Sequence, residues 1–154
     1  MQRIVDASLV AKWFLPEERK DKAERILRDF IDDKVQLAAP DLIIAELCSI
    51  LWKRSTKLKD ISTSQAEQIL DDFLALRLPL RHSPGIAKTA LKIAISADHK
   101  IYDMLYIALA EESSCEFVTA DKTLVNKTRK DIRMPAMDRG YLKSRIRMQR
   151  GARQ

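Results

Sequence analysis

The chain has 154 residues, 46% of them hydrophobic, which is enough for one compact domain with a buried core. No stretch of about 18 apolar residues occurs and the N-terminus lacks the apolar region of a signal peptide, so we expect no membrane span. The formal net charge of +6 is unevenly distributed along the chain.

The excess positive charge lies at the C-terminal end. Residues 139–154 carry six basic residues and no acid, which accounts for the whole difference between 28 basic and 22 acidic residues. We therefore predict a domain over residues 1–138 and a basic tail over residues 139–154. The tail could contact a polyanion or could be a solvated chain end.

The two cysteines, Cys48 and Cys115, stand alone in apolar segments. This pattern favours reduced core cysteines over a disulfide or a zinc pair. Together with the missing signal peptide, it predicts a cytoplasmic protein.

Strand and helix patterns alternate along the chain, beginning with a strand at 2–5 and a short helix at 8–15 that Pro16 ends. The next segment, 17–33, carries apolar residues at helical spacing and predicts an amphipathic helix. The remaining expected segments are a strand at 35–39, helices from Pro40–Asp41 to about Lys53 and from Ser62 or Ser64 to about Leu76, a strand at 78–82, helices at 83–97 and 102–112, a strand at 115–120, a helix at 121–129 and an extended piece at 132–137. Short apolar strands that alternate with helices predict an α/β fold, with a parallel sheet covered on both faces.

Two acids, Asp6 and Asp121, follow a predicted strand and precede a predicted helix. In an open α/β sheet this position lies at the carboxyl edge, where ligands bind. Either residue could instead be a simple N-cap of the following helix. Asp103 lies in the first turn of a predicted helix, where an interaction with the helix dipole would also explain it.

Glu46 is harder to explain by capping, because it lies on the apolar stripe of its predicted helix. A lone buried carboxylate is costly, so a bound cation or a buried arginine partner is expected. If the fold gathers Glu46 with the three aspartates, the all-oxygen cluster suits Mg²⁺ or Mn²⁺. Two hydroxyls, Ser8 and Thr119, lie two residues from Asp6 and Asp121 and could orient a carboxylate, although turn bonding would also account for them.

Several other site classes are absent from the sequence. The chain has three glycines and no glycine-rich phosphate loop, which argues against dinucleotide and P-loop sites. His82 and His99 have no partner at metal-ligand spacing, and we expect surface or capping roles for both. No Ser-His-Asp or Cys-His arrangement is visible.

Four segments together resemble the PIN-domain family, and within it the VapC toxins of toxin–antitoxin systems. They are IVDASLVAKWFLPEE, APDLIIAELCSILWK, IYDMLYIALAEE and FVTADKTL, and they span about residues 1–125 in the order of the family. The resemblance implies a three-layer α/β/α sandwich and an Mg²⁺- or Mn²⁺-dependent endoribonuclease with Asp6, Glu46, Asp103 and Asp121 as catalytic metal ligands. It further implies Ser8 and Thr119 as supporting cofactor-site residues, a homodimer, RNA as substrate, and a small antitoxin protein that covers the site.

The chain departs from the family at two places. Family members often carry a further acid shortly after the last aspartate, where Leu124 and Asn126 stand here, so one or two metals remain possible. The arginine-rich end after residue 138 is not part of the family pattern. Two other functions stay open: a non-catalytic PIN-like module that binds RNA or protein, and a nuclease that acts on DNA.

Basic and aromatic residues supply candidate RNA contacts. One basic strip comprises Lys53, Arg54, Lys57 and Lys59, and a second comprises Lys127, Arg129, Lys130 and Arg133. Solvated helix faces are the alternative for both strips. For Trp13, Phe14 and Trp52 the sequence favours core or dimer contacts over base stacking.

Overall fold

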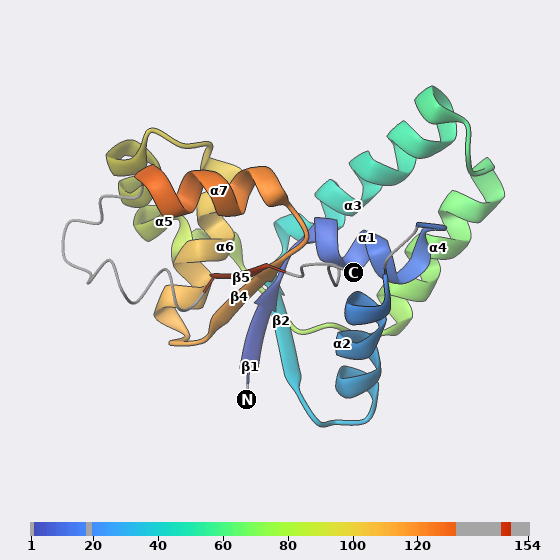
Figure 1. Ribbon diagram of the computed structural model, residues 1–154, viewed down its shortest axis with the longest axis horizontal. Coiled ribbons are helices and arrows are strands. Elements are labelled where there is room, and N and C mark those ends of the chain that lie inside the picture. Colours follow the sequence, from blue (N-terminus) through green and yellow to red (C-terminus); the bar gives the residue numbers. More distant parts are fainter. Residues whose placement is uncertain (1, 18–19, 132–145, 149–154) are drawn as a thin grey trace, which may run out of the picture.

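The strands form one parallel sheet at the centre of the molecule (Figure 1). In the computed structural model, which describes residues 2–17, 20–131 and 146–148, the strand order is β3-β2-β1-β4-β5 and every neighbouring pair is parallel. The strands are β1 Gln2–Val5, β2 Gln36–Pro40, β3 Leu80–Arg81, β4 Glu116–Thr119 and β5 Ile146–Met148. Because Val5 is in register with Val118, the residues that follow, Asp6 and Thr119, meet at the carboxyl edge of the sheet.

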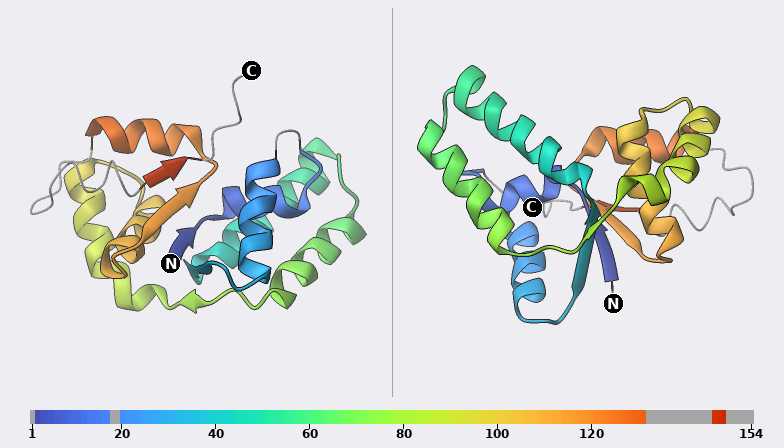
Figure 2. Two further views of the ribbon diagram at one scale, coloured as in Figure 1. Left: turned by 60° about the horizontal axis from the view of Figure 1, so that its bottom comes forward. Right: turned by 180° about the vertical axis from the view of Figure 1, so that it is seen from behind.

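Helices cover both faces of this sheet, as Figures 1 and 2 show. They are α1 Ala7–Phe14, α2 Asp21–Ile31, α3 Leu42–Trp52, the π-helix η1 Lys53–Leu58, α4 Thr63–Ala75, α5 Ser83–Ala97, α6 Ile101–Glu112 and α7 Lys122–Asp131. On one side α6 packs against β1, β2 and β4, while α1 and α2 lie on the other. The predicted α/β class and its three-layer α/β/α sandwich are confirmed.

The core includes α6 and the central strands, and it continues through buried residues of α1, α2 and α3. Ile4 and Val5 of β1 are fully buried, and every residue of α6 from Met104 to Ala110 is buried. An unbroken apolar run is expected where a strand or helix is enclosed on all sides. Packing therefore fixes the carboxyl ends of β1 and β4 and the first turn of α6. Asp6, Asp121 and Asp103 lie at these three places.

The α3–α4 arm extends away from the sheet (Figure 1). The α-helix predicted to end near Lys53 ends at Trp52, but helical turns that the sequence did not predict continue as the π-helix η1 to Leu58, where Lys59 adopts a left-handed conformation with φ of 55°. No glycine or proline occurs in residues 53–58 to end the helix earlier. Ser62 then caps α4 with a capping box, as one of the two predicted caps.

Other boundaries also differ from the prediction. α2 begins at Asp21 rather than near residue 17, and β3 has two residues rather than the five predicted. The extended piece expected at 132–137 lies outside the described residues. Of the predicted basic tail, only Ile146–Met148 is described, and it forms β5 beside β4.

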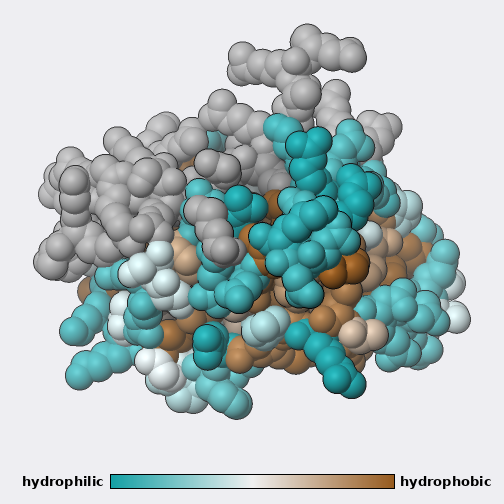
Figure 3. All heavy atoms as spheres, turned by 90° about the horizontal axis from the view of Figure 1, so that it is seen from below, coloured by the Kyte–Doolittle hydropathy of each residue, from teal (hydrophilic) through white to brown (hydrophobic). Residues whose placement is uncertain are grey.

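The sequence predicted reduced core cysteines and no membrane span. Neither cysteine forms a disulfide; Cys115 is buried and Cys48 is half-buried. In the described part of the chain, no helix has both the length and the apolar character needed to cross a bilayer. On the face drawn in Figure 3, hydrophobic surface is visible between hydrophilic side chains.

The predicted basic and aromatic surfaces are only partly present as predicted. The side chain of Arg54 is 13% exposed and pairs with Glu17 and Asp60, so it is not a solvated strip residue. Trp13 belongs to the core, whereas Trp52 is 56% exposed and lies outside it. The side chains of the second strip, from Lys127 onward, lie outside what the structure describes.

Candidate active site

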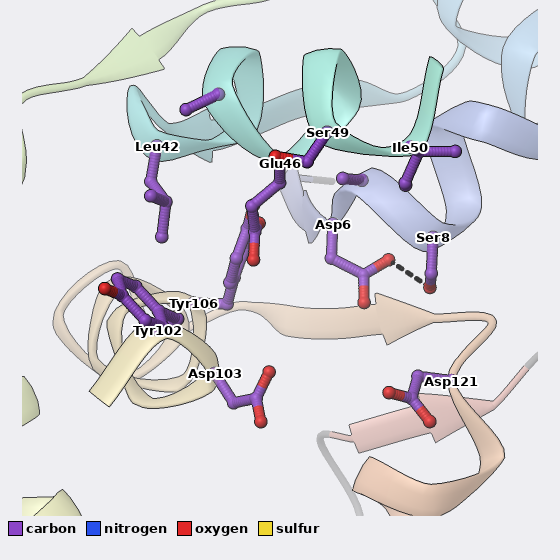
Figure 4. A pocket seen from close by; sticks show the side chains of 12 residues that line it. Asp6, Ser8, Leu42, Glu46, Ser49, Ile50, Tyr102, Asp103, Tyr106 and Asp121 are labelled. Atoms are coloured by element: carbon purple, nitrogen blue, oxygen red, sulfur yellow. Dashed lines mark hydrogen bonds between the residues drawn. The ribbon is translucent and has the colours of Figure 1, made fainter. Parts of the chain in front are cut away.

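The four predicted acids line one pocket (Figure 4). Asp6 follows β1, Glu46 lies in the middle of α3, Asp103 is in the first turn of α6, and Asp121 follows β4. The pocket has a volume of about 560 Å³, and among the residues that the structure describes its charged lining consists of these four acids. The fold therefore brings together side chains that are up to 115 positions apart, counting from 6 to 121.

Asp6 is the most firmly held of the four. Its Oδ1 accepts hydrogen bonds from the Leu9 backbone N–H (3.0 Å) and the Ser8 hydroxyl (2.8 Å), and its Oδ2 accepts one from the Thr119 hydroxyl. Asp6 is thus the N-cap of α1 and a pocket residue at once. Burial raises its pKa to about 6 despite these donors, and the negative charge of Asp121 adds to the rise.

The two predicted hydroxyls join Asp6 to the turn after β4. The Ser8 hydroxyl oxygen accepts from the Ala120 N–H (3.1 Å), and that of Thr119 accepts from the Asp121 N–H (2.9 Å). Thr119 is fully buried, while Ser8 lines the pocket. Both residues therefore fix the orientation of the Asp6 carboxylate and the position of Asp121.

Asp121 caps the start of α7. Its Oδ1 accepts hydrogen bonds from the backbone N–H groups of Thr123 (2.7 Å) and Leu124 (3.1 Å). Figure 4 shows its carboxylate facing the same space as those of Asp6 and Asp103. Like Asp6, Asp121 is both a helix cap and a pocket-lining residue.

Glu46 has a partner that the sequence interpretation did not anticipate. The hydroxyl of Tyr106, which lies one turn after Asp103 on α6, donates a hydrogen bond to its Oε2. The expected alternative, a buried arginine, is not the partner found. Burial raises the pKa of Glu46, and the negative charges of Asp6 and Asp103 raise it further, although the Tyr106 hydrogen bond acts in the opposite direction.

Asp103 lies beside a histidine whose position was predicted wrongly. His99 Nδ1 is 3.4 Å from Asp103 Oδ2, and the His99 side chain is only 9% exposed. His99 is therefore not the surface residue that the sequence suggested, because Asp98 ends α5 in a left-handed conformation and the short turn that follows leads into α6. His82, whose side chain is 93% exposed, does lie on the surface.

The donor chemistry of the pocket fits a hard cation. Its charged groups are carboxylates, and the charges of Asp6, Asp103 and Asp121 disfavour ionisation of their neighbours, a cost that a divalent ion would remove. As the side chains stand, however, no three of the carboxylates in the described residues lie close enough to hold one ion. The metal-ligand assignment thus remains a prediction that requires rotation of the carboxylates toward one another.

The PIN-domain model matches residues 3–130, a segment that includes the four acids and both hydroxyls. The chain belongs to the PIN-domain family. It is also 31% identical over 131 residues to Ribonuclease VapC3 of Pyrobaculum aerophilum, a match that covers 82% of this chain and 95% of that protein. The chain is therefore a PIN-domain protein of the VapC type.

A solved structure supports the fold of this PIN domain independently. The crystal structure of PAE2754 from Pyrobaculum aerophilum superimposes with a TM-score of 0.64, covering 82% of this chain and 79% of that one. At 24% sequence identity, the match concerns the arrangement of the chain. It agrees with the parallel sheet and with the helices on both of its faces.

Tyr106 and His99 are the neighbours of the acids that sequence reasoning missed. Tyr106 could have been suspected, because it lies three residues after Asp103 and hence on the same face of a helix. His99 lies four residues before Asp103, but a turn separates the two. Helical spacing alone could therefore have placed Tyr106 on the same face as Asp103, but it could not have placed His99 beside Asp103.

Proposed function

We propose that this PIN-domain protein is a metal-dependent endoribonuclease that hydrolyses RNA phosphodiester bonds, and the toxin component of a VapBC-like toxin–antitoxin pair. The observation that carries the proposal is the single pocket lined by Asp6, Glu46, Asp103 and Asp121 from four separate parts of the fold. The similarity to a protein named Ribonuclease VapC3 supports RNA as the substrate class.

The proposed ion is Mg²⁺ or Mn²⁺, with these four acids as its ligands. Bound there, it would supply Lewis-acid polarisation of a phosphate oxygen. Without a cation, a pocket whose charged lining is entirely acidic repels a phosphodiester. The carboxylates thus bind RNA only indirectly, and metal loading is the proposed condition for substrate entry.

The supporting residues hold the acids in place before substrate arrives. Ser8 and Thr119 donate to opposite oxygens of Asp6, so its carboxylate is oriented by the fold itself. Tyr106 occupies Oε2 of Glu46, which leaves Oε1 as the oxygen that could accept a proton from the attacking water.

The proposed partners follow from the family. We propose a homodimer in the cytoplasm, and a small antitoxin that inhibits cleavage by covering the acidic pocket. The RNA is single-stranded or looped where it is cut, because a pocket of this size cannot enclose a regular duplex. The basic residues of the 139–154 tail are a further candidate contact for the RNA backbone.

The proposal is tested on protein purified free of its antitoxin. Cleavage of single-stranded RNA should require Mg²⁺ or Mn²⁺ and should stop with EDTA. Asp6→Asn and Asp103→Asn should each abolish cleavage while keeping the circular dichroism spectrum of the wild type. Asp71→Asn, on the exposed face of α4, is the matched control and should cleave normally. Wild-type activity in both pocket variants would refute the proposal.

A non-catalytic RNA- or protein-binding module is the second candidate, and one observation favours it. Asp6 and Asp121 each cap a helix, Glu46 has a tyrosine partner, and no three described carboxylates are arranged around one point. Titration calorimetry with Mn²⁺ separates the two functions. A nuclease should bind Mn²⁺, and Glu46→Gln should lose this binding, whereas a binding module should show no Mn²⁺ binding that depends on Glu46. Parallel assays on single-stranded DNA and RNA distinguish a DNA nuclease.

A further inference from the structure

Tyr102 and Leu42 lie toward one end of the pocket and Asp6 and Asp121 toward the other, with Glu46 nearer the middle (Figure 4). Leu42 begins α3 and Tyr102 is in the first turn of α6. Apolar and acidic residues alternate around the lining, because Asp103 lies beside Tyr102 and Ile50 lies on the side of Ser8. The pocket therefore suits a ligand that has both an apolar and a charged part.

Tyr102 is exposed in the first turn of α6, before the enclosed part of the helix begins. The residue is 58% exposed, whereas the α6 residues Met104 to Ala110 are all buried. Within the described part of the chain, its ring stacks on no other aromatic ring and its hydroxyl makes no hydrogen bond. By contrast Trp52, which is exposed to a similar degree, has the ammonium group of Lys57 5.4 Å from its ring centroid.

We infer that Tyr102, with Leu42 beside it, forms a stacking subsite for one unpaired nucleobase of the RNA, an inference that rests on the proposed function. A nucleotide joins a flat, π-faced base to an anionic phosphate, and the pocket offers an open aromatic ring beside a carboxylate cluster. Tyr102 is adjacent in sequence to Asp103, so a base on the ring is attached to a backbone that passes the acids. The pocket volume of about 560 Å³ is large enough to hold a nucleotide.

The subsite has a consequence for the substrate. A base can stack on Tyr102 only after it has left its own helical stack, so the RNA must be single-stranded or bulged at this nucleotide. The ring offers a face to any base, and the contact therefore strengthens binding with little sequence preference.

The experiment compares variants that separate the ring from its hydroxyl. Cleavage of a single-stranded oligoribonucleotide gives KM and kcat. Stopped-flow quenching of 2-aminopurine in the same oligonucleotide, recorded with Mg²⁺ present before the first turnover is complete, reports stacking. Tyr102→Phe should behave as wild type. Tyr102→Leu and Tyr102→Ala should raise KM by about tenfold or more with little change in kcat, and should lose the quenching. Trp52→Ala, which removes a comparably exposed ring outside the pocket, should leave both values unchanged.

The outcomes distinguish this inference from the proposed function. If wild-type protein cleaves RNA and the Leu and Ala variants keep its KM and its quenching, the subsite is wrong and the nuclease stands. If wild-type protein neither cleaves nor binds RNA, the proposed function itself fails. An equal rise in KM for Trp52→Ala, or a change of oligomeric state with Tyr102→Ala in gel filtration, would overturn the subsite by assigning the ring to a diffuse or protein-binding surface.

Discussion

The hydroxyl of Tyr106 donates a hydrogen bond to Oε2 of Glu46 and so joins α6 to α3 across the pocket. Tyr106 is 2% exposed, and its ring stacks on Phe117 of β4 with centroids 5.8 Å apart. Ring packing fixes the hydroxyl, and the hydroxyl in turn fixes a half-buried carboxylate. The core of this PIN domain thus determines where one of its four pocket acids lies.

Replacing Tyr106 with Phe should lower the free energy of unfolding by about 1–3 kcal/mol. The ring would still pack on Phe117, but Glu46 would lose its donor while remaining half-buried. Urea denaturation at neutral pH measures the change, and RNA cleavage should fall as Glu46 loses its fixed position. Tyr102→Phe removes a hydroxyl from an exposed ring and serves as the control, since it should leave stability unchanged. Equal stability of Tyr106→Phe and wild type would show that the hydrogen bond contributes nothing.

Much of the fold could be predicted from the chain because local chemistry and tertiary packing agree. The apolar run of α6 and the residues Ile4 and Val5 of β1 are buried, so their patterns have one structural solution. The π-helix η1 that follows α3 could not be predicted, since residues 53–58 have no strong helix-ending residue and Arg54 of η1 pairs with Glu17 and Asp60, which lie outside η1. Two-residue β3 likewise owes its existence to its neighbour β2.

In the candidate site, too, local sequence patterns could be interpreted but tertiary contacts could not. Asp6 and Asp121 could be placed at the sheet edge, and Asp103 in the first turn of its helix, because the sequence pattern defines these positions. The partners of the acids could not, because Tyr106 reaches Glu46 across 60 positions and its direction depends on how α6 packs on α3. Sequence therefore located the carboxylates, while the hydrogen bonds that orient them required the tertiary structure.

The raised pKa of Asp6 predicts a pH dependence of stability. Its pKa is about 6 in the folded protein against an ordinary value of 3.8, so between these values the folded state holds a proton that the unfolded state has lost. Stability from this group is therefore present at low pH and decreases as pH rises through about 6, by about 3 kcal/mol in total. Unfolding free energies in EDTA, measured from pH 4 to 7.5 for wild type and Asp6→Asn, should differ increasingly in favour of the variant. A difference that stays constant with pH would contradict the shift.

The buried hydroxyl of Thr119 should contribute to the stability of the folded protein. Thr119→Val keeps the shape of the side chain but leaves Oδ2 of Asp6 and the N–H of Asp121 without their partner. We expect a loss of about 1–3 kcal/mol in unfolding free energy and a further rise in the pKa of Asp6, because the Thr119 hydrogen bond lowers that pKa. Thr123→Val, at an exposed position of α7, is the matched control. Both variants unfolding at the same denaturant concentration would show that the hydroxyl network is unimportant.

Divalent metal should stabilise the protein, because it relieves repulsion that the folded state otherwise bears. The charges of Asp103 and Asp6 disfavour ionisation of Glu46, and that of Asp121 disfavours ionisation of Asp6. An ion that binds only the folded state at 100 times its dissociation constant adds about 2.7 kcal/mol. Melting temperatures with Mn²⁺ or Mg²⁺ should therefore rise for wild type and Asp71→Asn, and should not rise for Asp103→Asn. The rise should be greater at pH 7.5 than at pH 5, since Asp6 with a pKa of about 6 must lose its proton before it can bind a cation. An equal rise in Asp103→Asn would place the ion elsewhere and remove Asp103 from its ligands.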